Sequence, residues 1–260
     1  VAGEYVYNHP CAMYNEADFT RVKKMLDDGT APVMVKTELA NLKNSPYTSL
    51  TYTPSPQEEI VRGEATGTIP GKENYSYAMK DAAAAYQTAL LWKLTGDVKY
   101  ADLSVKILNA WADVCKRITS NDANQMLAAG CQGYTFANAA EIMQTYEGWS
   151  ANDIADFKTW IVNVFASKNK DFLDNHQGTN NCSLHYWSNW DLVNMCSYLA
   201  IGILTENNDM VNFVVNYFYS GVGNGCISNL IQATFDDPLG SGEQISQNQE
   251  SGRDQGHACM

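Results

Sequence analysis

The sequence predicts an all-α fold, an incomplete α/α toroid (barrel) of antiparallel helical hairpins, with residues 1–260 forming a single domain. Three observations favour this fold. Apolar residues recur mostly at helical spacing. Few runs alternate apolar and polar residues with the β-branched enrichment that is typical of strands. No pattern of about 34 residues recurs, as it would in a short-period helical solenoid.

The first predicted helix follows Asn15, a residue type that favours the N-cap position, with Asp18 three positions later. Phe19 opens an apolar series at helical spacing, and Gly29 ends it. This helix is therefore expected between the cap and the glycine.

The clearest unit is a pair of helices over residues 75–95 and 98–118, each with one apolar stripe. The turn between them is Thr95-Gly96-Asp97, which supplies a helix stop, a tight bend and a cap for the second helix. A link this short makes neighbouring helices run antiparallel.

Two segments interrupt the helical pattern. Residues 44–72 are rich in proline and glycine, as in loops that act as lids or bind ligands. Residues 220–252 are rich in Gly, Asn and Gln, which fits either a linker or part of a site. The remaining predicted helices span 123–146, 151–172 with Ser150 as its cap, 187–205 and 209–219.

The charge balance excludes some classes of partner. Acidic residues outnumber basic ones by 29 to 17, and the formal net charge is −12. A general nucleic-acid binder normally has a basic face, and a polybasic membrane anchor needs clustered cations. The longest apolar stretch, 198–204, is far shorter than the ~20 residues that cross a bilayer. We therefore expect neither nucleic-acid nor membrane partners.

Compartment and completeness follow from the ends of the chain and its cysteines. The sequence starts at Val1 without a leader, as in a mature secreted form or a trimmed chain. Seven cysteines without a CxxC pair favour two or more disulfides in an exported protein, extracellular or periplasmic. Residues 253–260 resemble the first turns of a helix, so we expect the natural chain to continue beyond Met260. A monomer is expected.

The segment 180–194 holds the first candidate site. If a helix begins near His185, then His185 and Asn189 lie four residues apart on one face. Tyr186, Trp187 and Trp190 add flat aromatic surfaces of the kind on which sugar rings stack. The alternative interpretation is that both tryptophans belong to the core and that the histidine is structural.

The second candidate site lies in the segment 247–257. Arg253 and His257 are again four residues apart, and Glu250 precedes them by one turn. Arg253 is the only Lys or Arg from Asp171 to the end of the sequence. It either pairs with a neighbouring carboxylate such as Glu250, or it binds the carboxylate of a substrate through its two parallel N–H donors.

Together these residue types suit the β-elimination of a sugar acid. The uronate carboxylate must be neutralised so that the carbanion next to it can delocalise. Amide and guanidinium groups are suitable donors for this task. A base must remove the proton at C5, and an acid must protonate the departing glycosidic oxygen. His and Tyr side chains suit these two steps.

Four segments carry a resemblance to a known family. They read DAAAAYQTALLWKLTGDVKYADLSVKILNAWA, GYTFANAAEIM, HYWSNWDLVNM and QESGRDQGH. The chain resembles the alginate-lyase-like polysaccharide lyases from His9-Pro10 to its last residue, and most of all the group that acts on glucuronan and polymannuronate. The resemblance implies an incomplete α/α toroid, a groove or tunnel for an acidic polysaccharide, and metal-independent β-elimination.

By this resemblance, Asn189 and Arg253 neutralise the uronate, and His185, His257 or Tyr186 transfers protons. The substrate-binding residues implied are Asn181, Trp187, Trp190, Gln249 and Glu250. Two features differ from better-known relatives, which read Asn-His-x-Tyr-Trp and place a tyrosine after the arginine. Here no asparagine directly precedes His185, so Asn189 or Asn181 must take that role, and the catalytic tyrosine can lie elsewhere or beyond Met260.

Other functions were weighed against this one. A glycoside hydrolase on a similar toroid needs two carboxylates, which Asp236-Asp237 could supply, and would act on a neutral glycan. A non-catalytic helical interaction module would instead bury His185 and Arg253 as structural groups. His176, His185 and His257 lack the close spacing of metal ligands, so the sequence predicts no metal site and no cofactor.

Overall fold

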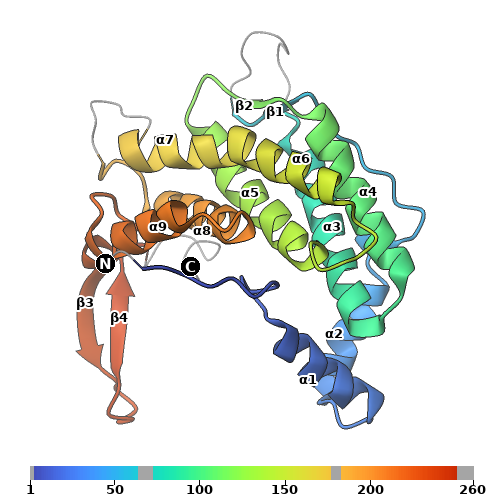
Figure 1. Cartoon of the computed structure of the whole chain (residues 1–260). Coiled ribbons are helices and arrows are strands. Elements are labelled where there is room, and N and C mark those ends of the chain that lie inside the picture. Colours follow the sequence, from blue (N-terminus) through green and yellow to red (C-terminus); the bar gives the residue numbers. More distant parts are fainter. Residues whose placement is uncertain (1–2, 64–72, 177–182, 251–260) are drawn as a thin grey trace.

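The computed structural model describes residues 3–63, 73–176 and 183–250, and this part of the chain is mainly helical (Figure 1). The expectation of a mainly helical chain is confirmed, with two small two-stranded sheets added. None of the described helices combines the length and the apolar character needed to cross a bilayer. In chain order the elements are α1 Glu16–Asp27, α2 Val33–Lys43, a 3-10 turn at Pro46–Thr48, β1 Glu59–Val61, α3 Tyr75–Thr95, α4 Val98–Val114, β2 Arg117–Thr119, α5 Asn124–Met143, α6 Ala151–Ile161, a π-helical segment at Val162–Ala166, α7 Ser167–Asn175, α8 Ser188–Leu204, α9 Asn208–Ser220, α10 Ile227–Leu230, β3 Ile231–Asp236 and β4 Gln244–Asn248.

Helix ends with local capping signals lie where the sequence predicts them. Asn15 and Asp18 form a reciprocal capping box at the start of α1. The α3–α4 turn contains Gly96 in the left-handed region, with φ 74°, and Asp97 accepts a hydrogen bond from the Lys99 N–H at 3.0 Å. Ser150 caps α6 by accepting from the Asp153 N–H at 3.1 Å.

Tertiary contacts shift other boundaries. The helix predicted over 98–118 ends at Val114, because residues 117–119 form β2 and pair in parallel with β1. Ile118 lies opposite Ile60 in this pair, and both side chains are buried. The helix expected from 187 begins at Ser188, and the helix expected over 151–172 continues through the π-helical segment to the end of α7.

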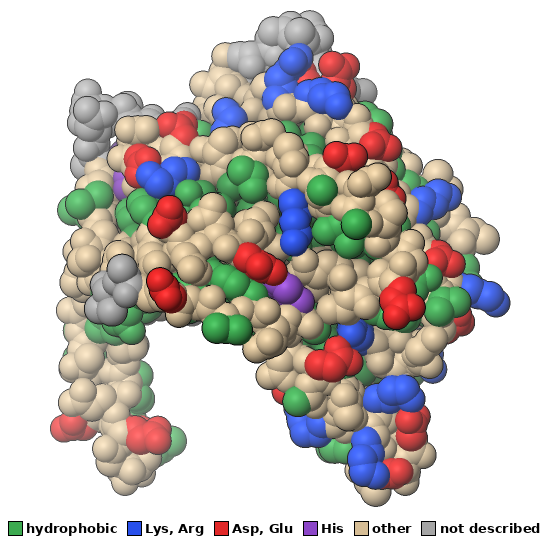
Figure 2. Space-filling view, in the orientation of Figure 1, with side chains coloured by type: hydrophobic (Ala, Val, Ile, Leu, Met, Phe, Trp, Pro, Cys, Tyr) green, Lys and Arg blue, Asp and Glu red, His purple; other side chains and the backbone are tan. Residues whose placement is uncertain are grey.

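Several elements were not predicted, namely α2, α10, the β1–β2 pair and the β3–β4 hairpin. Within the polar segment 220–252, β3 and β4 pair antiparallel, with Phe235 opposite Ile245. Nearly every residue of both strands is exposed, so no alternation of buried and exposed positions marks them. The hairpin and the α1–α2 pair project from opposite ends of the body, both toward the bottom of the view (Figures 1 and 2).

Helix α5 lies at the centre of the core. Fifteen of its twenty residues are buried, and it packs against α3, α4, α7 and α8. Its Phe136 ring meets the rings of Trp111, Trp160 and Phe165 at centroid distances of 5.6, 5.7 and 6.0 Å. These distances lie in the range where aromatic pairs attract one another. These contacts fix the position of α5 in the core, and α8 is positioned by packing against α5.

Small residues allow α5 and α8 to approach closely. A Cβ atom at Gly133 would lie 2.3 Å from the Ser197 hydroxyl oxygen and 3.0 Å from the Phe165 ring. At Gly130 it would lie 2.7 Å from a Val193 methyl group. Both distances are shorter than van der Waals contact, so glycine is needed at this crossing.

Gly133→Ala is expected to lower the free energy of unfolding by about 1–3 kcal/mol, because the added methyl group overpacks the α5–α8 contact. Alanine's higher helix propensity, about 1 kcal/mol, opposes this effect. Thermal melting followed by circular dichroism measures the net change. Adding Ser197→Ala removes the closest clashing atom and should restore part of the loss. A Gly133→Ala variant that melts at a higher temperature than the wild type would show that the contact is not tight.

The expectation of two or more disulfides is not confirmed. Five of the seven cysteines lie in the described residues, and all five are free thiols. No disulfide therefore joins any two of these five. The free cysteines are Cys11, Cys115, Cys131, Cys196 and Cys226.

Candidate active site

The start of α8 is held by the end of β4, some sixty residues further along the chain. The Gln249 side-chain oxygen accepts a hydrogen bond from the Ser188 N–H at 2.6 Å. One Glu250 carboxylate oxygen accepts from the Asn189 N–H at 2.7 Å and from the Ser188 hydroxyl at 3.2 Å. A carboxylate is favourable here because a helix N-terminus carries partial positive charge. The structure thus brings Asn189, Gln249 and Glu250 together, with the last two serving as caps of α8.

The Asn189 side chain lies in this capped turn without a partner of its own. Asn189 is 6% exposed, and its buried side-chain oxygen has no hydrogen-bond partner. An unsatisfied buried polar group costs about 1–3 kcal/mol, and such groups in native proteins call for an explanation. The amide is therefore a candidate for binding a ligand: a ligand hydroxyl could donate the hydrogen bond that the oxygen lacks, and the amide NH2 group could donate to a ligand carboxylate.

His185 does not share a helical face with Asn189, so this part of the prediction is wrong. Residues 184–186 form a turn before α8, because Asn224 donates hydrogen bonds to the Leu184 and Tyr186 carbonyl oxygens at 3.1 and 2.7 Å. His185 is exposed, and its ring meets the Tyr186 ring edge-on at 4.9 Å. The histidine is accessible to a large ligand but belongs to the turn.

The aromatic residues divide between surface and core. Trp187 is 43% exposed and lies directly before α8. Tyr186 and Trp190 are half-buried, and their ring centroids lie 4.8 Å apart. Both rings pack against Phe172. Trp187 thus presents a surface on which a sugar could stack, whereas Trp190 also serves the core.

The environment of Tyr186 favours its protonated form. Burial raises the pKa of the Tyr186 phenol, and the negative charge of Asp122 raises it further. The ordinary pKa of tyrosine is already about 10. The phenol therefore holds its proton at neutral pH and can act as a proton donor.

A buried polar network next to α8 was missed by the sequence analysis. His176 Nε2 lies 2.8 Å from a carboxylate oxygen of Asp191 and 3.0 Å from the Tyr217 hydroxyl. The Gly225 N–H donates to the other Asp191 oxygen at 2.8 Å. A Cβ at Gly223 would lie 2.1 Å from Asp191 and 2.6 Å from His176. The network ties α7, α9 and the 221–226 loop to the first turns of α8.

One sequence signal points to this network. The run Gly-Val-Gly-Asn-Gly at 221–225 is typical of a backbone that approaches other groups closely. His176 is 2% exposed, so it positions its neighbours and does not meet solvent. Asn181, Arg253 and His257, which were predicted to belong to the site, lie outside the described residues.

The fold and this helix start define a class of protein: it is mainly helical, with an amide oxygen that lacks a hydrogen-bond partner and an accessible aromatic ring at the start of one helix. The sequence profile of the alginate lyase family matches residues 33–228. The chain therefore belongs to the alginate lyase family. Among curated protein sequences, none is significantly similar to it.

Solved structures show the same fold. The crystal structure of alginate lyase A1-III from Sphingomonas species A1 is 18% identical, with a TM-score of 0.58 over 77% of this chain and 57% of that one. A variant of alginate lyase A1-III in complex with a tetrasaccharide is also 18% identical, with a TM-score of 0.62 over 87% of this chain and 62% of that one. The chain thus spans less than two thirds of the length of these proteins.

Proposed function

We propose that this protein is a polysaccharide lyase that cleaves a uronic-acid polymer, glucuronan or polymannuronate, by metal-independent β-elimination on an incomplete α/α toroid. Membership of the alginate lyase family supports the reaction class. The tetrasaccharide in the neighbouring structure supports an oligosaccharide ligand. The observation that carries the proposal is the buried amide of Asn189 at the start of α8, whose oxygen has no hydrogen-bond partner, close in sequence to exposed His185 and Trp187.

In this proposal the carboxylate of the sugar is neutralised by Asn189 and Arg253. Three residues of chain reach at most about 11 Å, so the link from Glu250 is short enough for Arg253 to act beside Asn189. Neutralisation lowers the cost of the carbanion at C5, where charge develops. The Asn189 side-chain oxygen has no hydrogen-bond partner, so the amide can rotate to turn its NH2 donor toward the ligand.

Proton transfer then falls to a histidine, either His185 or His257, and to Tyr186. The histidine takes the C5 proton, the bond between C4 and the glycosidic oxygen breaks, and a double bond forms between C4 and C5. The departing oxygen takes a proton from Tyr186, whose raised pKa suits a donor. Trp187 supports the sugar ring by stacking.

The acidic groups near the site are compatible with an anionic substrate. Glu250 is 1% exposed and is hydrogen-bonded at the start of α8. Asp191 is 2% exposed and accepts from the Gly225 N–H and lies against His176. Both carboxylates are thus buried and accept hydrogen bonds from the protein itself.

The rival hydrolase is not favoured by the position of its carboxylates. Asp236 ends β3, and Asp237 accepts hydrogen bonds in the hairpin turn from the Leu239 and Ser241 N–H groups at 2.9 and 3.3 Å. A hydrogen bond from the Ser241 side chain lowers the pKa of Asp237. A fully ionised turn residue is unsuited to the general-acid role that hydrolysis needs.

The nature of the product tests the proposed function. Incubation with glucuronan or polymannuronate is expected to generate ultraviolet absorbance from the new carbon–carbon double bond, in step with new reducing ends. The chain as a whole is assayed, with an uncharged glucan as the control polymer. Reducing ends without the absorbance would establish hydrolysis, and no cleavage of either uronan would refute the proposed substrate class.

A further inference from the structure

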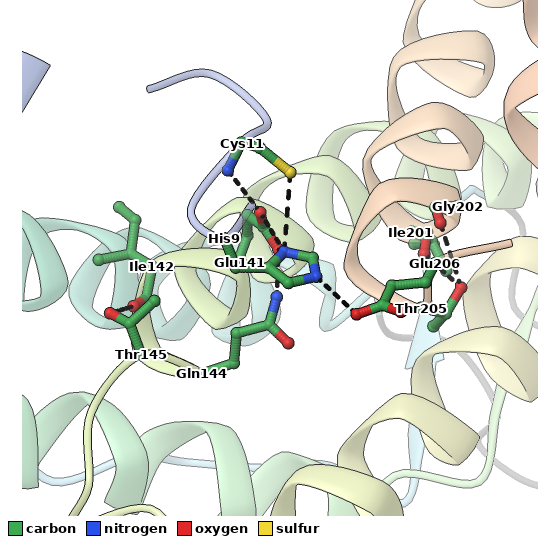
Figure 3. Close-up of polar contacts among 10 residues, drawn as sticks. All are labelled: His9, Cys11, Glu141, Ile142, Gln144, Thr145, Ile201, Gly202, Thr205 and Glu206. Atoms are coloured by element: carbon green, nitrogen blue, oxygen red, sulfur yellow. Dashed lines mark hydrogen bonds and ion pairs between the residues drawn. The ribbon is translucent and has the colours of Figure 1, made fainter. Parts of the chain in front are cut away.

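A second polar cluster lies at the opposite end of α8 from Asn189. There the N-terminal segment, residues 3–11, runs across the body toward α1 (Figure 1). His9 and Cys11 of this segment face Glu141 in the last turn of α5, and Glu206 follows α8 (Figure 3). Helix α8 has 17 residues, so at 1.5 Å per residue about 25 Å separate this cluster from the candidate active site.

Three different types of metal ligand converge in this cluster. His9 Nδ1 lies 2.8 and 3.0 Å from the two carboxylate oxygens of Glu141. The Cys11 sulfur lies 3.7 Å from the same nitrogen. The ligand atoms of the three residues all lie within 4.8 Å of one another. Of the residues that the structure describes, this is the one group with such an arrangement.

The groups around the cluster orient these ligands. The second ring nitrogen of His9, Nε2, lies 3.0 Å from a carboxylate oxygen of Glu206. Metal-binding histidines usually donate their other ring N–H in this way, which leaves the first nitrogen free to coordinate. Glu141 is 1% exposed and accepts hydrogen bonds from the Cys11 N–H, at 2.8 Å, and from the Gln144 amide.

We propose that His9 Nδ1, Cys11 Sγ and the Glu141 carboxylate bind a zinc-class divalent transition-metal ion, with one position open to water. A mixed nitrogen, sulfur and oxygen set suits such an ion, whereas Ca²⁺ and Mg²⁺ prefer oxygen alone. Metal–ligand bonds of about 2.0–2.3 Å in a tetrahedron place the ligand atoms about 3.3–3.8 Å apart. The 3.7 Å between Cys11 Sγ and His9 Nδ1 already fits this range, whereas His9 Nδ1 and the Glu141 oxygen at 2.8 Å would have to move apart by about 0.5 Å.

The geometry assigns this ion a structural role. Four of the nine residues of the N-terminal segment are exposed and only Pro10 is buried, and its other anchors are hydrogen bonds such as that from the Tyr7 hydroxyl to Asn208 at 2.7 Å. A metal would fix this segment to the end of α5 and, through Glu206, to the end of α8. The metal site lies too far from Asn189 for the ion to take part in the proposed elimination. The proposed metal site and the proposed lyase function are therefore independent of each other.

Cobalt and zinc binding to the purified, metal-stripped chain tests the site. Co²⁺ is expected to bind one per chain and to produce the near-ultraviolet charge-transfer band of a cobalt–thiolate bond. Cys11→Ser should lose the band, whereas Cys196→Ser, at an exposed cysteine on α8, should keep it. Glu206→Gln should weaken Co²⁺ binding about 10–100-fold, because Glu206 orients a ligand without being one.

Zinc should also raise the melting temperature of the wild type by about 5–10 °C at a hundredfold excess over Kd. The shift should vanish in Cys11→Ser and in His9→Ala, and circular dichroism checks that both variants fold. Absence of stoichiometric Co²⁺ binding to the wild type would overturn the proposal. A band that persists in Cys11→Ser would overturn it equally, as would a zinc shift that both variants retain. In each of these three cases the cluster would be an imidazole hydrogen-bonded between two carboxylates.

Discussion

Asn189→Ala is expected to lower the rate of unsaturated-product formation by about 10²–10³-fold, the usual effect of removing one donor to a developing anion. The same substitution should leave the melting temperature unchanged or raise it slightly. The reason is that the Asn189 side chain makes no hydrogen bond to a described residue and leaves a buried oxygen unsatisfied. The initial rate of absorbance increase and a thermal melt measure the two effects.

Two further variants separate a catalytic from a structural role for Asn189. Asn189→Asp keeps the shape of the side chain but places a second carboxylate beside Glu250, so it should bind a uronate even more weakly. Asn163→Ala removes an exposed amide in the π-helical segment and serves as the control. A marked loss of stability in Asn189→Ala with little loss of rate would contradict the proposed role.

Arg253 offers a test of whether two groups act on one carboxylate. Arg253→Ala should lower turnover by about 10²–10³-fold, to a residual rate that can still be measured, and leave the helical circular dichroism intact. If Asn189 and Arg253 neutralise the same charge, the double variant should lose less than the sum of the two single losses, because groups that act as a unit are not additive. Additive losses would place them at separate steps.

Asp81→Ala is expected to lower the free energy of unfolding by at least about 3 kcal/mol, since several buried donors lose their acceptor at once. Asp81 is 2% exposed on α3 and accepts hydrogen bonds from the Tyr52 hydroxyl at 2.6 Å, the Ser55 N–H at 2.7 Å and the Trp111 ring N–H at 2.7 Å. Burial, followed by the hydrogen bond to Asp81, raises the pKa of Tyr52, so this phenol remains a donor.

The melting temperature of Asp81→Ala should fall by about 6–12 °C. The matched control is Asp102→Ala on α4, where an exposed carboxylate accepts one hydrogen bond from the Tyr146 hydroxyl at 2.6 Å. Such surface changes usually stay within about 0.5 kcal/mol. Equal melting temperatures for the two variants would show that the segment containing Tyr52 and Ser55 is not anchored through Asp81.

Sequence patterns predicted the helices whose ends carry their own capping groups. The capping box of Asn15 and the Gly96–Asp97 turn are formed by residues next to one another in the chain, so they can be recognised without tertiary structure. The hairpin β3–β4 could not be predicted in this way, because its strands are exposed on both faces. The α5–α8 crossing is also invisible locally, since Gly133 gains its importance only opposite Ser197.

The candidate site shows the same division. The sequence by itself singled out Asn189, Tyr186, Trp187 and His185, because amides, phenols and aromatic rings clustered in one segment suit a uronate. Only the tertiary structure decided that α8 begins at Ser188, since Asn224 and Glu250, distant in sequence, set the turn and the helix cap. It also decided that His9 and Cys11 meet Glu141, 130 residues beyond Cys11. Residue types determine which chemistry is possible, whereas packing between distant segments determines which of these groups come within reach of each other.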